Sequence, residues 1–384
     1  PVGLHLGSFE FSRSLRHWIN DGLMTLFFFV VALELKRELV LGELRNLRMA
    51  TLSFAGALGG MVVPAVLYVA LQRGEPGGHG WGTVMATDTA FLIGCLAVLG
   101  SRIPSNLRVF LLSLAIFDDI GAILVVAIGY GDELNWIAIA LGALGLAAVF
   151  GIARLGIRSV AIYFLLGGLI WLAFDASGVH ATISGVLLGL MTPTGGWISN
   201  TRLRAILDRV IARPRGDNAS EAASDRKALV LARVATREAL SPVERLEMAL
   251  HPWVGFAIMP LFAFANAGIP LSIKDFGGSV TVAIFVGFAL GKPVGVLALS
   301  WLAVRLGIAT RPPELSWGLI AAGGLLTGIG FTMALFIADL AFGQDLLGAA
   351  KLGILSASAV SAAAGVLALA WLTRKRDASA DYTG

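Results

Sequence analysis

Residues 107–129 read LRVFLLSLAIFDDIGAILVVAIG, an apolar run long enough to span a bilayer, with the adjacent carboxylates of Asp118 and Asp119 near its centre. A charged side chain at that depth costs about 2.5–3.5 kcal/mol on insertion scales, so such residues are rare and mark functional sites. A further aspartate, Asp88, and one lysine, Lys292, lie in two other apolar runs. Three acids and one base at mid-depth indicate a membrane protein that handles ions or protons.

The composition is that of a polytopic membrane protein, whose main partner is the lipid bilayer. Of 384 residues, 57% are hydrophobic and 14% are charged, whereas soluble domains carry about 25% charged residues. The net charge of +4 does not predict a nucleic-acid partner, because the basic residues lie in short loops that orient the chain. The one cysteine, Cys95, excludes an intramolecular disulfide and a thiolate metal cluster.

Eleven apolar runs are predicted to span the membrane, which makes the fold class an all-α polytopic membrane protein. Their approximate cores are residues 18–35, 52–71, 81–99, 107–130, 136–153, 160–174, 179–191, 253–269, 280–302, 317–340 and 352–372. Before them, Pro1 to Ser12 alternates apolar with polar or small residues around Gly7 and Ser8, which predicts a short amphipathic hairpin.

Loop charges predict the orientation of these spans. The loops after the first, third, fifth, seventh and ninth spans are basic, and the C-terminus ends in Arg374-Lys375-Arg376, so these segments are predicted to be cytoplasmic. The remaining loops, to which Asp339 and Asp345 are assigned, carry few basic residues. The hairpin then lies outside, and an odd number of spans with an outside N-terminus predicts that a preceding helix is missing.

The polar stretch from Pro193 to Pro252 is predicted to be a cytoplasmic linker with two helical patches, 200–212 and 225–239. It separates an N-terminal membrane half, residues 1–192, from a C-terminal half, residues 253–384.

Two spans contain polar or glycine-rich interruptions. Residues 85–91 read MATDTAF, and residues 323–332 read GGLLTGIGFT. Each interruption lies in the middle of a three-span group, and the two groups start on opposite sides of the membrane, which predicts inverted repeats with broken helices and a site between them. Broken helix ends leave partial charges at mid-membrane, and Asp88 and Lys292 have the signs needed to offset them.

Two adjacent carboxylates in a low-dielectric environment do not easily both stay ionised, so protons and a hard cation compete for the oxygens of Asp118 and Asp119. Thr87 adds a hydroxyl beside Asp88. The plainer alternatives are a structural ion pair for the aspartates and Lys292, a helix cap for Asp88, and packing for His180 and Thr182.

A group of charged residues borders the first and eighth spans, where solvated helix ends are the plainer interpretation. This group comprises Glu34, Lys36, Arg37, Glu38, Glu247 and His251.

Several motifs closely resemble the NhaA family of bacterial sodium/proton antiporters over essentially the whole chain. They are ATDTAF (86–91), AIFDDIGA (115–122), SGVHAT (177–182), LHPWV (250–254), PLFAFANAG (260–268), GKPVG (291–295) and GIGFTM (328–333).

The resemblance implies the NhaA fold, with two inverted repeats and two broken, crossed helices. It implies that Asp119 is the central Na⁺ ligand, that Asp118 is its neighbour and the partner of Lys292, and that Asp88 and Thr87 belong to the first broken helix. It further implies that the group from Glu34 to His251 senses pH and that Pro1 to Ser12 forms a homodimer contact.

Three departures from the family pattern stand out: the first helix is absent, the linker is longer, and Met248 replaces a histidine of some relatives.

The sequence therefore predicts an electrogenic, pH-activated antiporter of the inner membrane rather than an enzyme. It would exchange cytoplasmic Na⁺ or Li⁺ for external protons by alternating access, with no resident cofactor. A passive cation channel is a rival that the buried lysine and the broken helices disfavour. An intramembrane aspartyl protease is another, but its Gly-x-Gly-Asp motif occurs here only as GYGD (129–132), at the outer end of a span.

Overall fold

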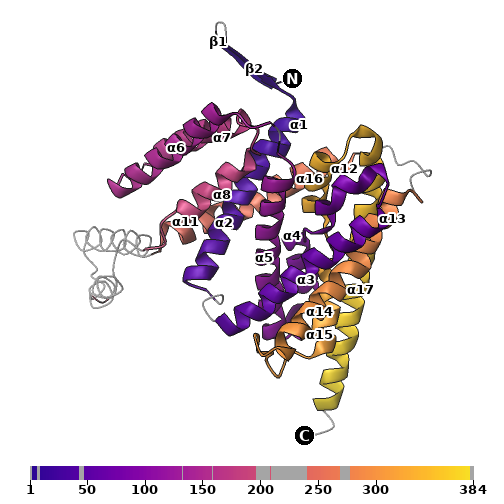
Figure 1. Cartoon of the computed structure of the whole chain (residues 1–384). Coiled ribbons are helices and arrows are strands. Elements are labelled where there is room, and N and C mark those ends of the chain that lie inside the picture. The colour runs from indigo at the N-terminus through magenta and orange to yellow at the C-terminus, as the bar shows by residue number, and fades with distance from the viewer. Residues whose placement is uncertain are drawn as a thin grey trace, which may run out of the picture.

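The protein is a bundle of helices with a β-hairpin projecting from one end (Figure 1). The computed structural model describes residues 2–6, 9–42, 47–131, 133–157, 159–195, 208, 240–268 and 277–380. The predicted hairpin is confirmed, since β1 (Val2–Leu6) pairs antiparallel with β2 (Phe9–Arg13) and Leu4 lies opposite Phe11. We call this the hairpin end of the molecule; the C-terminus lies at the opposite end (Figure 1).

The spans follow one another in the predicted order. In the N-terminal part they are α1 (Leu15–His17) with the π-helical turn η1 (Trp18–Leu23) and α2 (Met24–Val40), α3 (Leu47–Leu71), the 3-10 segment η3 (Pro76–Val84) with α4 (Thr89–Leu99), α5 (Ser105–Gly129), α6 (Trp136–Arg154), α7 (Val160–Asp175) and α8 (Thr182–Met191). In the C-terminal part they are α11 (Pro242–Trp253) with η5 (Val254–Ile258) and α12 (Met259–Ala267), α13 (Ser279–Val286) with η7 (Gly287–Gly291) and α14 (Lys292–Arg305), α15 (Trp317–Thr327) with α16 (Phe331–Ala341), and α17 (Gln344–Ala380).

All eleven predicted spans correspond to helices in the described part of the chain. Seven are long and apolar enough to cross a membrane, two bent pairs each form one more, and α7 and α8 are shorter apolar helices. Many leucine, isoleucine and phenylalanine side chains on these helices remain exposed, as expected where lipid is the solvent. The chain is therefore a multi-pass membrane protein.

The eighth span begins earlier than predicted. Helix α11 starts at Pro242 rather than near Trp253, so its first residues belong to a helix and not to the linker. Ser241 and Glu244 form a capping box, in which the Ser241 hydroxyl accepts from the Glu244 N–H and the Glu244 carboxylate accepts from the Ser241 N–H at 2.9 Å. The two predicted linker helices, 200–212 and 225–239, lie outside the described residues, apart from position 208.

Both predicted interruptions are real breaks. The axis bends by 46° between η3 and the segment that starts with α4, and by 49° between α15 and α16. Gly328 lies in the second break, where an added Cβ would come within 2.7 Å of the Phe288 carbonyl oxygen. A side chain there would also meet the Ser361 hydroxyl, so the glycine permits the second break to pack closely on η7 and α17.

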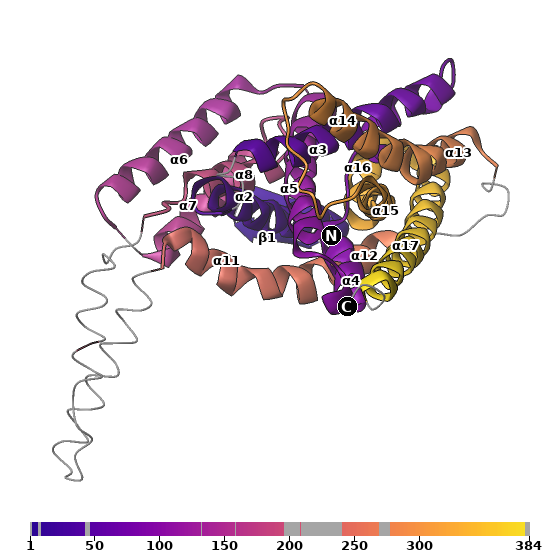
Figure 2. The same cartoon turned by 90° about the horizontal axis from the view of Figure 1, so that it is seen from below.

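Helix α5 lies near the centre of the bundle in both views, whereas α6 lies at the edge far from α13 and α17 (Figures 1 and 2). On one side α3 packs closely on α14. Their backbones meet at Gly59 and Gly295, where a Cβ on either glycine would overlap the backbone of the other. The start of α14 also packs on α15, where a Cβ on Gly324 would come within 3.3 Å of Pro293 Cα, so Lys292 lies next to the second broken span.

Candidate ion site

The breaks of the two interrupted spans meet each other. The Asp88 N–H, at the end of the first break, donates to the Ile329 carbonyl of the second break at 2.7 Å. The Thr87 hydroxyl lies 3.0 Å from the Thr327 carbonyl oxygen, which belongs to the last turn of α15. Carbonyl groups freed by the second break thus find partners in the first, as irregular backbone within a membrane must.

Lys292 and Asp118 form a fully buried ion pair beside this crossing. The Lys292 Nζ lies 2.5 Å from Asp118 Oδ2, and both side chains are 0% exposed. Lys292 Nζ also donates to the Thr87 hydroxyl, whose oxygen lies 2.5 Å from the same Asp118 oxygen. The ammonium thus lies near the partially negative end of α15, with Asp118 as its counter-ion. The expectation that a buried aspartate would pair with Lys292 agrees with this geometry.

Asp119 occupies a different environment from its neighbour. It is 3% exposed, and its Oδ2 accepts from the Thr89 hydroxyl of α4 at 3.1 Å. Its Oδ1 is buried without a hydrogen-bond partner in the described residues, as is Asp118 Oδ1. Buried carboxylate oxygens are normally satisfied. Oxygens with spare lone pairs are also the ligands that a hard cation prefers, so these carboxylates offer oxygen ligands for such a cation.

Asp88 links two helix N-termini. It is the N-cap of α4, where its Oδ1 accepts from the Phe91 N–H at 3.2 Å. Its Oδ2 accepts from the Thr332 N–H at 2.9 Å and from the Thr332 hydroxyl at the start of α16. The carboxylate therefore compensates two positive helix ends at once. The cap and charge-compensation interpretations of Asp88 both describe this geometry, and both of its oxygens already have protein partners.

Three residues that the sequence did not mark as site residues complete the site. Thr89 and Thr332 lie inside the quoted motifs, so their hydroxyls were visible as part of the interrupted segments. The Ser358 hydroxyl of α17 accepts from the N–H groups of Gly330 and Phe331 at 3.3 and 3.2 Å. Nothing in the apolar sequence around Ser358 marks it, because its role depends on the packing of α17 against the start of α16.

Five of the six residues implied as a pH sensor lie close enough to interact electrostatically; they are Glu34, Arg37, Glu38, Glu247 and His251. Arg37 of α2 lies 3.0 Å from Glu247 of α11 and 2.7 Å from the neighbouring Glu38. Lys36 instead donates to the Leu190 carbonyl at 2.5 Å. Glu34 is half-buried and His251 is exposed. One ion pair thus joins α2 to α11 at the end of the bundle opposite the hairpin.

His180 has more than apolar packing around it. Its ring lies 5.4 Å from that of Phe336, and its Nε2 lies 3.5 Å from Asp21 Oδ1. The expectation of a plain packing histidine was therefore incomplete. Thr182 is buried at the start of α8, as a packing residue would be.

The geometry disfavours an aspartyl protease. Two protease carboxylates must face each other and share a proton, whereas Asp118 faces Lys292 and Asp119 faces Thr89. Asp132 of the GYGD sequence lies outside the described residues.

Two broken helices that cross beside a buried cluster of carboxylates and one lysine define the class of ion-coupled secondary transporters. The family model described as Na+/H+ antiporter 1 matches residues 1–369, and the chain belongs to this family. The chain is 65% identical to the "Na(+)/H(+) antiporter NhaA" of Rhizobium meliloti, with 97% of this chain and 85% of that protein aligned. It is also 62% identical to "Na(+)/H(+) antiporter NhaA 2" of Acidiphilium cryptum (97% and 83% covered) and 54% identical to the protein of that name in Vibrio vulnificus (97% and 84%).

Proposed function

We propose that this protein is an electrogenic antiporter that exchanges cytoplasmic Na⁺ or Li⁺ for external protons. The observation that carries the proposal is Asp119, a buried carboxylate of which one oxygen has no hydrogen-bond partner among the described residues, next to the compensated pair of Asp118 and Lys292. Sodium and protons compete for the same oxygens, so binding one ion releases the other. That competition couples the two fluxes without any resident cofactor.

Electrogenic exchange requires more than one proton for each Na⁺. Asp119 supplies one protonation site. The Asp118–Lys292 pair supplies a second protonation site. Burial disfavours the charged ammonium of Lys292, so this group can release its proton when Na⁺ binds. Release of both protons when Na⁺ binds leaves a net charge that moves through the membrane in each cycle.

Alternating access follows from the crossed breaks. The ends of four half-helices surround Asp88 and Thr87, and small relative movements of the two broken spans change which side of the membrane reaches Asp119. At low cytoplasmic pH the carboxylates stay protonated and the antiporter idles, whereas at alkaline pH it turns over. The Arg37–Glu247 pair supports a pH-sensing role for the end opposite the hairpin.

The remaining parts of the proposal concern location and assembly. The protein acts in the inner membrane, and the basic loops support an orientation with the C-terminus in the cytoplasm. The paired strands β1 and β2 project from the bundle and support homodimer formation through residues 1–12, because their outer edges remain available for pairing.

The test is ion exchange in reconstituted vesicles that carry a proton gradient, with a pH-sensitive dye inside. Sodium and lithium, but not choline, are expected to collapse the gradient, and the collapse is expected to be faster at alkaline than at acidic pH. Clamping the membrane voltage with potassium and valinomycin is expected to change the rate at which the proton gradient collapses, as electrogenic exchange requires. If the proton gradient cannot drive sodium against its own concentration gradient, the protein is a passive channel and the proposal is contradicted.

A further inference from the structure

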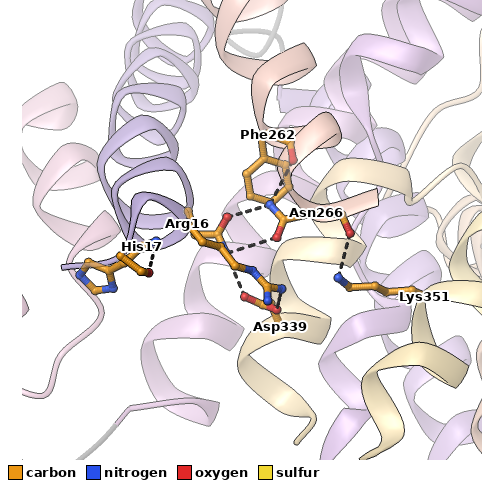
Figure 3. A network of polar contacts seen from close by, with 8 residues as sticks. Arg16, His17, Phe262, Asn266, Asp339 and Lys351 are labelled. Atoms are coloured by element: carbon orange, nitrogen blue, oxygen red, sulfur yellow. Dashed lines mark hydrogen bonds and ion pairs between the residues drawn. The ribbon is translucent and has the colours of Figure 1, made fainter. Parts of the chain in front are cut away.

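A second polar cluster, shown in Figure 3, lies where α1, α12 and α16 come together toward the hairpin end (Figure 1). Arg16 of α1 forms an ion pair with Asp339 of α16 through Nη2 and Oδ1, although the residues are 323 positions apart in sequence. The Asn20 side chain of η1 donates to Asp339 Oδ2 at 2.8 Å. We call Arg16, Asn20 and Asp339 the hairpin-end clamp. The sequence predicts that Asp339 lies in an outer loop, but the structure places it within helix α16, where its side chain contacts the first span.

The clamp is extended by two more helices. The Asn266 side chain of α12 donates to Asn20 Oδ1 at 2.7 Å, and the Lys351 ammonium of α17 donates to the Asn266 carbonyl at 2.8 Å. Figure 3 shows Arg16 and Asp339 facing each other, with Asn266 and Lys351 alongside. The network therefore ties α1 and α12 to α16 and α17 at one end of the bundle.

Helix α16 carries this clamp on the same face as its contact with the ion site. Thr332, Phe336 and Asp339 follow the spacing i, i+4 and i+7, which places them on one helix face. Thr332 binds Asp88, and Asp339 binds Arg16. A displacement of this half-helix therefore changes both contacts together.

An aromatic layer lies between the two polar contacts. The Phe336 ring has its centroid 5.8 Å from that of Phe28 in α2 and 6.2 Å from that of Phe262 in α12. These three side chains are at most 1% exposed. An ion that left the site along this face toward the hairpin end would have to pass this apolar layer and then the clamp. Opening this route requires α16 to separate from α1, α2 and α12.

We propose that the hairpin-end clamp is the latch of an external gate, which holds α16 against the first span and breaks each time the ion site opens toward the hairpin end. The inference rests on the alternating access proposed above. The clamp has the properties of a contact that breaks repeatedly. The Arg16 and Asp339 side chains are 40% and 19% exposed, so water can replace each partner at small cost.

The first test measures access to the closed layer rather than transport. Met24 is 0% exposed and lies one helical turn beyond Asn20. In a Cys95→Ser background, Met24→Cys is treated with a membrane-impermeant maleimide from each side, in right-side-out and in everted vesicles. We expect Asp339→Ala to increase the labelling rate roughly tenfold from the hairpin side alone, because the open state becomes more populated.

The matched control is Asp345→Ala, which removes an exposed aspartate near the same end, at the start of α17. It is expected to leave the labelling rate unchanged. The exchanged pair, Arg16→Asp with Asp339→Arg, is expected to restore slow labelling because the ion pair is formed again. An unchanged labelling rate in Asp339→Ala, from folded protein, would overturn the inference.

The second test locks the latch. Asn20→Cys with Asp339→Cys, again in the Cys95→Ser background, is bridged with a short bifunctional methanethiosulfonate. Exchange is expected to stop and to return after reduction, while each single-cysteine variant treated in the same way continues to exchange. Continued exchange by the bridged protein would also overturn the latch. Because labelling does not require transport, failure of the latch is distinguishable from failure of the proposed antiport, which would appear as no exchange by the unmodified protein.

Discussion

Asp119→Asn is expected to reduce sodium-driven proton exchange by roughly a hundredfold or more, because an amide neither carries the negative charge nor binds the exchanged proton. Among the described residues, Asp119 has the Thr89 hydroxyl as its hydrogen-bond partner, and its Oδ1 is buried with none. Asparagine preserves the shape and the hydrogen bond to Thr89, so the fold is expected to be retained. Exchange is measured in vesicles with an internal pH dye, at equal amounts of reconstituted protein.

The control for Asp119→Asn is Asp345→Asn, which neutralises an exposed aspartate on α17 far along the chain from the site. It is expected to exchange ions at the unmodified rate. Full exchange by Asp119→Asn would show that another group binds the cation, and the assignment of Asp119 would be wrong.

Lys292→Met is expected to lower the stability of the folded protein by about 3–5 kcal/mol, because it leaves the buried Asp118 carboxylate without its counter-ion. Both members of the pair are 0% exposed, so water cannot compensate the lost charge. The double variant Asp118→Asn with Lys292→Met is expected to regain most of this stability, since no isolated charge remains. The measurement is the thermal unfolding midpoint of detergent-solubilised protein.

Lys351→Met provides a matched comparison for the lysine. Lys351 is also buried, at 4% exposed, but its ammonium donates to the neutral backbone carbonyl of Asn266. Its loss removes a hydrogen bond and is expected to cost less than the loss of Lys292. Equal stabilities for Lys292→Met and the unmodified protein would mean that the pair does not contribute to the folded state as its geometry indicates.

The sequence predicted the parts of this structure that local patterns encode. The eleven spans follow from apolar runs, and the two breaks follow from the polar residues at 85–91 and the glycines at 323–332. A buried lysine needs a counter-ion, which made a buried aspartate the expected partner of Lys292. The capping-box residues Ser241 and Glu244 are a local signal for the start of α11, although the stretch around them is polar.

What the sequence left open depends on contacts between distant segments. Asp88 and Thr332 are 244 positions apart, and no local pattern indicates that one carboxylate compensates the ends of two helices. Ser358 reaches the start of α16 only through the packing of α17. Asp339 was assigned to a loop because it lies at the end of an apolar run, whereas its pairing with Arg16 requires the fold.

The central claim, that sodium and protons compete for the same buried carboxylates, is tested most directly by proton release on sodium binding. Purified protein in detergent is held in a weakly buffered solution with a pH indicator, and sodium chloride is added, with choline chloride as the reference. Calorimetry on the same samples reports sodium binding. Sodium is expected to release protons from the unmodified protein and none from Asp119→Asn. Sodium binding to the unmodified protein without proton release would contradict the claim.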